Sequence, residues 1–467
     1  MNGIRAVFNI PVLLSTARAL RKRERWTAEQ MREWQQLQFT DLVRFANEHS
    51  PFYRRLYAGI EVSGVLHPRD LPPVDKAMIM DHFDEVVTDP RLRLAEILEN
   101  LGRSDGVRLF KKRFRILSTS GTSGRRGLFV LDRREWITIL ALMLRWQRFT
   151  GLRPRIGRRK RIATIGAGNA MHASRLLPLG GDIGLYEFRF LSAAAPLDEI
   201  VRDLNAFRPD VLASYASIAG LLALEQFSGR LSIQPQIVVT HSELLTDSIA
   251  ARIERAWGSR PFNYYGLSEM PCLGIDCAFH RGIHIFEDLC VIEPVDSSGN
   301  PVAPGEVADK FYLTNLVNRA QPLIRYEVTD LIAVSPPDCP CGSPFSLIRK
   351  MQGRDDDVME LEGLAGGLVR IPALALTLGV EDLPGVVEHE ISFAESPPSI
   401  EILILADSTA SREGIGKRVS DEMESIFARF RVKRPALTIS FVDAFPRNHQ
   451  GMGKKKILRR NGGTTGE

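Results

Sequence analysis

Two stretches in the middle of the chain each combine a short strand-like run with helical patterns, and this alternation restricts the fold more than any other feature. They are VRDLNAFRPDVLASYASIAGLLAL (residues 201–224) and PQIVVTHSELLTDSIAARIERAWG (residues 235–258). Upstream, KRIATIGAG (residues 160–168) reads as a short strand that ends in glycines. Strands that alternate with helices predict an α/β fold with a largely parallel sheet covered by helices on both faces.

The two ends of the chain differ from this middle part. The first hundred residues carry apolar side chains near helical spacing and predict a helical N-terminal region. Residues 135–151 predict a long buried helix. Near the C-terminus, VVEHEISFA, SIEILILAD, a helix through KRVSDEMESIFARF, and ALTISFVDAF predict a compact β-β-α-β unit. A length of 467 residues suits two or three domains, so we expect a large α/β domain followed by a small α+β domain.

Composition excludes several classes of protein. The 61 basic and 56 acidic residues give a net charge of +5, which is not the focused basic surface that nucleic-acid binding requires. The basic run RKRER comes after the apolar N-terminal stretch, whereas a secretory signal has its positive charge before the apolar region. We therefore expect a helical arm rather than a signal peptide. No run approaches the roughly 20 apolar residues of a membrane span. Five cysteines, an odd number, favour the reducing cytoplasm.

The stretch LSTSGTSGRRG, residues 117–127, combines glycines with hydroxyl side chains. Glycines let backbone N–H groups turn toward an anion, and hydroxyls add donors, so the composition suits a polyphosphate. Arg125, Arg126 and Gly127 follow Gly124, so the Gly-Lys-Ser/Thr ending of a P-loop is absent. Composition alone leaves an ordinary flexible loop as the alternative.

Four later segments, taken in order with this loop, point to one family. They are FNYYGLSEM, PLIRYEVTDLI, GRDDDVMELEG and FPRNHQGMGKKKILRR, which begin at residues 262, 322, 353 and 445. In this order the segments resemble the adenylate-forming superfamily of acyl-CoA ligases, and specifically its phenylacetate-CoA ligase branch. The opening segments HSPFYRRLY and LPPVDKAMIMDHF are also similar to that branch, so the resemblance covers nearly the whole chain.

The resemblance implies an ATP site. The hydroxyl-rich loop would hold the β- and γ-phosphates while a substrate carboxylate attacks the α-phosphorus and pyrophosphate leaves. Arg126 and Gly127 stand where many members have Pro and Lys, and an arginine can supply that positive charge. Glu269 matches the acidic residue at the ATP-bound Mg²⁺, a cation that prefers oxygen ligands, and Tyr265 is expected beside the adenine. Asp330 matches the aspartate that accepts both ribose hydroxyls. The residues assigned to ATP or AMP are Ser120, Gly121, Thr122, Ser123, Gly124, Ser242, Tyr265, Gly266, Asp330 and Arg354.

The resemblance also implies a hinge at Asp356, between a large domain of residues 1–353 and a small mobile domain of residues 354–467. Rotation about the hinge would separate adenylation from transfer to the acceptor thiol. Lys454 matches the lysine that bridges the attacking carboxylate and the α-phosphate during adenylation. Without the earlier motifs, the segment GKKKILRR would read as a basic tail.

The cysteines are unevenly placed and suggest a second kind of site. Thiolates and imidazoles gathered from two short loops are typical of structural zinc, and some members of the branch carry such a metal. We therefore expect a zinc site formed by Cys277, His280, Cys339 and Cys341. His284 and Cys272 are competing ligands, Cys290 is expected to be a buried core residue, and unliganded reduced cysteines are the alternative.

The leading functional hypothesis is an ATP-, Mg²⁺- and coenzyme A-dependent ligase, with a homodimer as a further expectation. It would convert a carboxylic acid, aromatic or arylacetic by resemblance, into an acyl-adenylate and then a thioester. The acid pocket is expected near Tyr215, Ala170 and His172. Rival hypotheses keep adenylation but use an amine or carrier-protein acceptor, or treat the chain as a non-catalytic, zinc-stapled binding protein.

Overall fold

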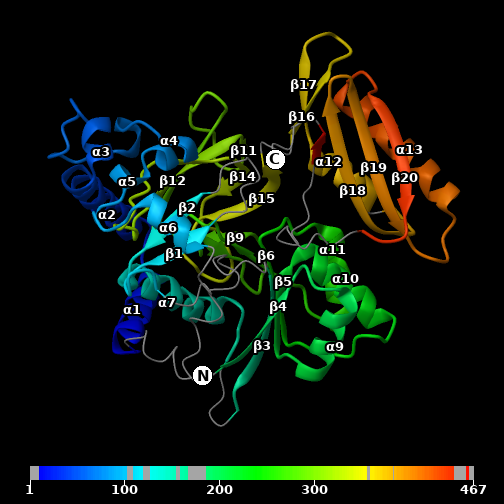
Figure 1. Cartoon of the computed structure of the whole chain (residues 1–467), viewed down its shortest axis with the longest axis horizontal. Coiled ribbons are helices and arrows are strands. Elements are labelled where there is room, and N and C mark those ends of the chain that lie inside the picture. Colours follow the sequence, from blue (N-terminus) through cyan, green and yellow to red (C-terminus); the bar gives the residue numbers. More distant parts are fainter. Residues whose placement is uncertain are drawn as a thin grey trace.

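The computed structural model describes residues 10–101, 109–118, 127–153, 158–166, 186–354, 358–381, 383–445 and 459–461. Figure 1 shows the N-terminal helices and a large mixed sheet in one part of the molecule, and a smaller sheet with its own helices in another. Among the described residues, none of the helices is long and apolar enough to cross a bilayer.

The N-terminal region is helical, as the sequence predicts. Its helices are α1 (Ile10–Arg23), α2 (Ala28–His49), α3 (Pro51–Leu56), α4 (Lys76–Asp81), α5 (Phe83–Val86) and α6 (Leu94–Leu101). α2 begins at a capping box, in which the Thr27 side chain accepts a hydrogen bond from the Gln30 N–H and the Gln30 side chain accepts one from the Thr27 N–H. Tyr53 is fully buried and donates its hydroxyl hydrogen to the Pro322 carbonyl, 2.9 Å away, which attaches these helices to the sheets.

The largest sheet has ten strands in the order β11-β14-β15-β9-β8-β7-β6-β5-β3-β4. Its parallel half consists of β3 (Lys160–Gly166), β4 (Tyr186–Ser192), β5 (Val211–Tyr215), β6 (Ile237–His241) and β7 (Phe262–Tyr265). The antiparallel half consists of β8 (Gly274–Ile275), β9 (Ile283–Ile285), β11 (Val307–Ala308), β14 (Asp330–Ser335) and β15 (Leu347–Arg354). The sheet is therefore mixed rather than largely parallel. The sequence did not predict the antiparallel half, because very short strands such as β8 and β9 carry too few residues to show a period.

Helices α9 (Leu197–Phe207), α10 (Ala216–Phe227) and α11 (Asp247–Trp257) follow strands of the parallel half, and their apolar residues form one buried cluster with those strands. The predicted long helix is α7 (Arg133–Phe149). Two further sheets complete this part of the molecule: β1 (Arg115–Ser118) with β2 (Leu128–Leu131), and β10 (Cys290–Val295) with β12 (Lys310–Asn315) and β13 (Tyr326–Val328).

The C-terminal unit, defined here as residues 358–381, 383–445 and 459–461, has its own core. A hairpin of β16 (Val358–Glu362) and β17 (Leu368–Pro372) leads into α12 (Ala373–Glu381). β18 (Val386–Glu395), β19 (Pro398–Ala406), α13 (Arg412–Phe430) and β20 (Ala436–Val442) then form the predicted β-β-α-β unit, and β21 (Arg459–Asn461) pairs with β18. The α/β fold with a small α+β part is thus confirmed.

A buried ion pair attaches the N-terminal helix to the rest of the structure. Arg145 on α7 binds the Asp288 carboxylate through both terminal nitrogens at 2.8 Å, and donates to the Leu20 carbonyl at 2.9 Å. Its Nε lies 3.3 Å from a Glu24 carboxylate oxygen, and the side chains of Arg145 and Asp288 are 1% and 0% exposed. A buried charge left without its partner is strongly destabilising, so this pair maintains the position of α1.

We expect Arg145→Met to lower the unfolding free energy by about 3–5 kcal/mol, because the buried Asp288 would lose both of its 2.8 Å hydrogen bonds from Arg145 and keep only the longer contact with Arg23, at 3.6 Å. The double variant Arg145→Met/Asp288→Leu should recover much of this loss. The matched control is Arg434→Met, since the Arg434–Glu424 pair has a 2.6 Å separation but both side chains are more than half exposed. Urea denaturation followed by circular dichroism measures the unfolding free energy of each variant. Equal losses in Arg145→Met and Arg434→Met would contradict the prediction.

Candidate functional site

Three parallel strands end side by side at residues that the sequence assigns to binding. The pairing register sets Tyr215, the last residue of β5, beside His241, the last residue of β6, and sets His241 beside Tyr264 of β7. The Tyr215 and His241 rings meet edge to face with centroids 5.4 Å apart. Ser242 follows with a φ of 64°, and its Oγ lies 3.2 Å from His241 Nδ1. The carboxyl ends of parallel strands are where α/β proteins bind ligands.

Tyr265 and Asp330 lie in direct contact, although they are 65 positions apart. The Tyr265 hydroxyl donates to Asp330 Oδ2 at 2.5 Å, and both residues are almost completely buried. Asp330 is the first residue of β14, and the register of β14 with β15 pairs it with Arg354. The fold therefore gathers three of the predicted nucleotide residues at one location, and Arg354 is placed there by its strand position.

Glu269 lies in the turn after β7 and has two contacts that orient it. The Tyr326 hydroxyl donates to Glu269 Oε1 at 3.0 Å, and the Asn315 side chain donates to the Glu269 carbonyl at 2.9 Å. The carboxylate is a hard oxygen donor of the kind Mg²⁺ prefers. The residues therefore fit the cation that the sequence assigns to Glu269.

Gly266 permits the tight path of the chain between Tyr265 and Glu269. A Cβ at this position would lie 2.2 Å from the Pro271 carbonyl oxygen and 3.0 Å from a Tyr264 ring carbon. The Tyr264 hydroxyl donates to the same Pro271 oxygen at 2.5 Å, so the carbonyl is fixed in place. The glycine is required here by close approach of the backbone, which is a structural reason for its place in the motif.

A buried polar loop, residues 315–321, connects Glu269 to the strand after the hydroxyl-rich loop. Asn315 contacts Glu269, Asn318 donates to the Val130 carbonyl at 3.0 Å, and Gln321 accepts from the Val130 N–H at 2.8 Å. All three side chains are buried. Sequence reasoning missed them, and the only available signal was an amide-rich segment, NLVNRAQ, within otherwise apolar sequence.

Glu135, at the start of α7, supports the same loop. Its Oε1 accepts hydrogen bonds from the backbone N–H groups of Arg319 and Ala320 at 2.6 and 2.9 Å, and its Oε2 accepts one from Asp132 at 2.5 Å. Burial, together with the nearby Asp132 charge, raises the pKa of Glu135 to about 7 despite these hydrogen bonds. The side chain thus joins β2, α7 and the polar loop.

Several predicted residues lie outside the described residues. These are Ser120, Gly121, Thr122, Ser123, Gly124, Ala170, His172, Asp356 and Lys454. The hydroxyl-rich loop is flanked by the paired strands β1 and β2, whose register joins Ser118 to Leu128. The segment with Ala170 and His172 follows β3, whose last residue is Gly166.

A second cluster brings together Cys277, His284, Cys339 and Cys341, whose ligand atoms all lie within 4.8 Å of one another. The Cys277 and Cys339 sulfurs are 3.5 Å apart, and Cys341 Sγ is 3.4 Å from His284 Nε2. Burial lowers the pKa of His284 to about 4, so the imidazole is neutral, as a metal ligand must be. Three thiols and one imidazole from the β8–β9 and β14–β15 segments are a donor set that suits tetrahedral Zn²⁺.

This geometry corrects one predicted ligand, because His284 takes the place assigned to His280. His280 Nδ1 lies 2.8 Å from Asp276 Oδ2, in a hydrogen bond within its own turn. Sequence spacing favoured His280, three residues after Cys277, but the pairing of His284 on β9 with Leu347 on β15 sets His284 beside the other cysteines. Cys290 is fully buried in the core, as predicted, and Cys272 is buried near Tyr264, outside the cluster.

Comparison with known proteins agrees with these features. No family model matches the chain. A phenylacetate-coenzyme A ligase of Thermus thermophilus is 27% identical over 376 residues, which cover 77% of each chain. One from Aromatoleum evansii is 24% identical over 366 residues, which cover 76% of this chain and 77% of the relative.

Solved structures show the same fold. A 2-hydroxyisobutyryl-CoA ligase in its postadenylation state, in complex with 2-HIB-AMP, superposes with a TM-score of 0.76 at 18% identity, covering 94% of this chain and 91% of that one. The same ligase with 2-HIB-AMP and CoA in the thioesterification state gives a TM-score of 0.60, covering 94% and 92%. The fold is that of the adenylate-forming ligases. The curated relatives are phenylacetate-CoA ligases, which confirms the predicted resemblance to that branch and the predicted enzyme class of AMP-forming acid–thiol ligases.

We expect Gly266→Ala to displace the segment that carries Glu269, because the added Cβ would overlap the Pro271 carbonyl. The unfolding free energy should fall by about 1–3 kcal/mol, the range for overpacking a well-packed site. Gly64→Ala is the matched control, since a Cβ there meets nothing within 4 Å. Thermal unfolding of both variants checks this, and a Gly266→Ala protein as stable as the control would show that the segment adapts without cost.

Proposed function

We propose that the protein activates a carboxylic acid with ATP to form an acyl-adenylate and then transfers the acyl group to coenzyme A. The observation that carries the proposal is the contact between Tyr265 and Asp330 at the carboxyl ends of the parallel strands, with Glu269 anchored one turn away. Relatives with this fold are ligases that bind acyl-adenylates, and the curated relatives are phenylacetate-CoA ligases.

In this proposal the described residues bind and orient the nucleotide. Asp330 accepts hydrogen bonds from the ribose hydroxyls, while Tyr265 fixes that carboxylate through its own hydroxyl and offers its ring to the adenine. Glu269 would hold the Mg²⁺ that neutralises phosphate charge, with Tyr326 keeping one carboxylate oxygen in place. Ser242 and Gly266 border the same space, and Arg354 is assigned to the sugar-phosphate region.

The chemistry then runs in two steps. A carboxylate oxygen of the acid attacks the α-phosphorus of ATP, the bond from that phosphorus to the bridging oxygen breaks, and pyrophosphate leaves. The thiol sulfur of coenzyme A next attacks the acyl carbon, loses its proton, and releases AMP. Ser120 to Gly124 are assigned to the phosphates, and Lys454 to the charge that builds up between carboxylate and phosphate in the first step. An aromatic or arylacetic acid is the proposed substrate, with Tyr215, Ala170 and His172 bordering its pocket.

We further propose two arrangements of a small domain, residues 354–467, against a large domain, residues 1–353, with Asp356 at the hinge. The chain superposes better on the postadenylation form of 2-hydroxyisobutyryl-CoA ligase than on its thioesterification form, with TM-scores of 0.76 and 0.60. This difference supports the assignment of the present arrangement to adenylation. The other arrangement would admit the acceptor thiol.

The test is pyrophosphate release from ATP and Mg²⁺ across aromatic, arylacetic and aliphatic acids, each with and without coenzyme A. Acid-dependent release, with AMP and a thioester formed only when coenzyme A is present, is the expected result. If pyrophosphate is released but the product forms with an amine or a carrier-protein thiol, that group and not coenzyme A is the acceptor. Absence of release with every acid, together with salt-sensitive retention of nucleic acid, would favour the binding-protein hypothesis.

We also propose that Cys277, His284, Cys339 and Cys341 hold a structural zinc ion. The cluster connects the β8–β9 segment, which continues from the Glu269 turn, to the segment between β14 and β15. The ring of Phe149, at the end of α7, lies 5.3 Å from the His284 ring and covers one side. Four protein ligands leave no open position, so the metal would stabilise the fold rather than take part in the reaction.

Elemental analysis of purified protein should give about one zinc per chain. His284→Ala should lose most of the metal and lower the melting temperature, whereas His280→Ala should retain the metal because His280 pairs with Asp276 instead. The reverse result would restore the ligand that sequence spacing predicted. Protein that contains no zinc and binds none when it is added would reject the site.

A further inference from the structure

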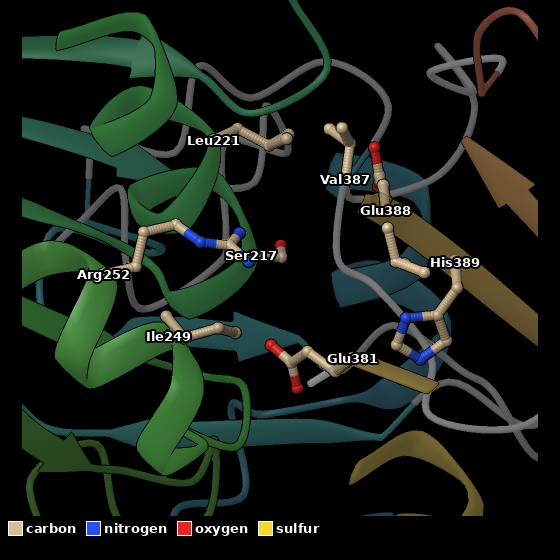
Figure 2. A pocket seen from close by; sticks show the side chains of 9 residues that line it. Ser217, Leu221, Ile249, Arg252, Glu381, Val387, Glu388 and His389 are labelled. Atoms are coloured by element: carbon tan, nitrogen blue, oxygen red, sulfur yellow. The ribbon is translucent and has the colours of Figure 1, made fainter. Parts of the chain in front are cut away.

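The C-terminal unit meets the large part of the chain across a small cleft, shown in Figure 2. One side is formed by Ser217 and Leu221 on α10 and by Ile249 and Arg252 on α11. The other side is formed by Glu381, the last residue of α12, and by residues 386–389 of β18. The two sides come from segments more than a hundred positions apart.

One hydrogen bond crosses next to this cleft. The Thr246 hydroxyl donates to Glu381 Oε1 at 3.2 Å. The same hydroxyl oxygen caps α11, where it accepts the Ile249 N–H at 3.2 Å. Because the cap uses an oxygen lone pair, the hydroxyl hydrogen is left to point toward Glu381. The cap fixes the position of the hydroxyl oxygen, so the donor lies at a defined place beside Glu381.

Charges on the two sides are complementary. Arg252 extends from α11 into the cleft, and Glu381 and Glu388 face it from the C-terminal unit (Figure 2). The side chain of His389 lies beside them and is 3% exposed. Opposite charges facing each other across an interface favour one relative position of the two surfaces over others.

The same helices are joined directly to the candidate site. α10 begins immediately after Tyr215, and α11 begins five residues after Ser242. Glu243 Oε2 accepts the Ser217 N–H at 2.9 Å, which connects the 242–246 loop to the start of α10. A change in the position of this loop would therefore shift residues at both the strand ends and the cleft.

We propose that the Thr246–Glu381 contact holds the C-terminal unit in the adenylation arrangement, and that the contact must break before acyl transfer. Thr246 and Glu381 are then positioning residues that set the balance between the two half-reactions. This inference rests on the proposed function, because the two half-reactions belong to it. A contact present in one arrangement can shift the population of that arrangement only by its own differential strength.

Four variants separate the contact from the helix cap. Thr246→Ser keeps both the cap and the donor. Thr246→Asp keeps a capping oxygen but sets a second carboxylate against Glu381. Thr246→Asp/Glu381→Gln restores a hydrogen bond with reversed direction, since the amide can donate to the new carboxylate. Ser411→Asp is the matched control, because Ser411 caps α13 in the C-terminal unit, away from the contact, and its hydroxyl oxygen accepts the Gly414 N–H at 3.2 Å.

Single-turnover pyrophosphate release and thioester formation from supplied acyl-adenylate measure the two half-reactions separately. We expect Thr246→Asp to slow the first by roughly threefold to tenfold, the effect of one typical intramolecular hydrogen bond, and to leave the second unchanged or faster. The double variant should recover adenylation, and the Ser variant and the Ser411→Asp control should match the original protein. Equal slowing of both half-reactions, no slowing, or no recovery in the double variant would overturn the proposal.

A distance measurement makes the result independent of turnover. Spin labels at S228C and D421C, both at exposed positions, report the separation of the large part and the C-terminal unit. Thr246→Asp should broaden or shift the distance distribution of the ligand-free protein, and the double variant should restore it. An unchanged distance distribution in Thr246→Asp would overturn the inference, even if the original protein releases pyrophosphate as proposed. A shifted distribution in a protein that never releases pyrophosphate would reject the proposed function alone.

Discussion

The common direction of β3, β5, β6 and β7 is the constraint on which the rest of the site depends. Because parallel strands end at one edge, residues that follow different strands are brought together without any contact in sequence. Tyr215, Ser242 and Tyr265 are each within one residue of a strand end. Asp330 joins them from the antiparallel half, through its hydrogen bond with Tyr265. The mixed sheet therefore supplies predicted nucleotide residues from both of its halves.

A second requirement is that the strand following the hydroxyl-rich loop keeps a fixed position relative to Glu269. The 315–321 loop fulfils this requirement with hydrogen bonds from buried side-chain amides rather than with apolar packing. Each amide satisfies backbone groups at a specific separation, so the loop accepts only one alignment of β2 and the Glu269 turn. Apolar packing would tolerate small shifts between β2 and the Glu269 turn.

The sequence predicted the α/β fold, the C-terminal β-β-α-β unit and the family, because strand and helix periods and ordered motifs are local signals. It did not predict the antiparallel half of the sheet, since β8 and β9 are too short to show a pattern. His284 was ranked below His280 for the same reason: spacing within a turn is visible in the sequence, whereas strand pairing with β15 is not. Asn315, Asn318 and Gln321 were missed because a buried amide resembles a surface one until the fold surrounds it.

The environment of Glu135 makes folding of this chain a proton-binding event near neutral pH. The carboxyl has a pKa of about 7 in the folded protein, raised by burial from the ordinary value of 4.5. Between those two values the folded state holds a proton that the unfolded state has released, so this group's contribution to stability decreases as the pH rises from 4.5 to 7. The polar loop that Glu135 supports thus links the alignment of β2 and Glu269 to the acidity of the surrounding solution.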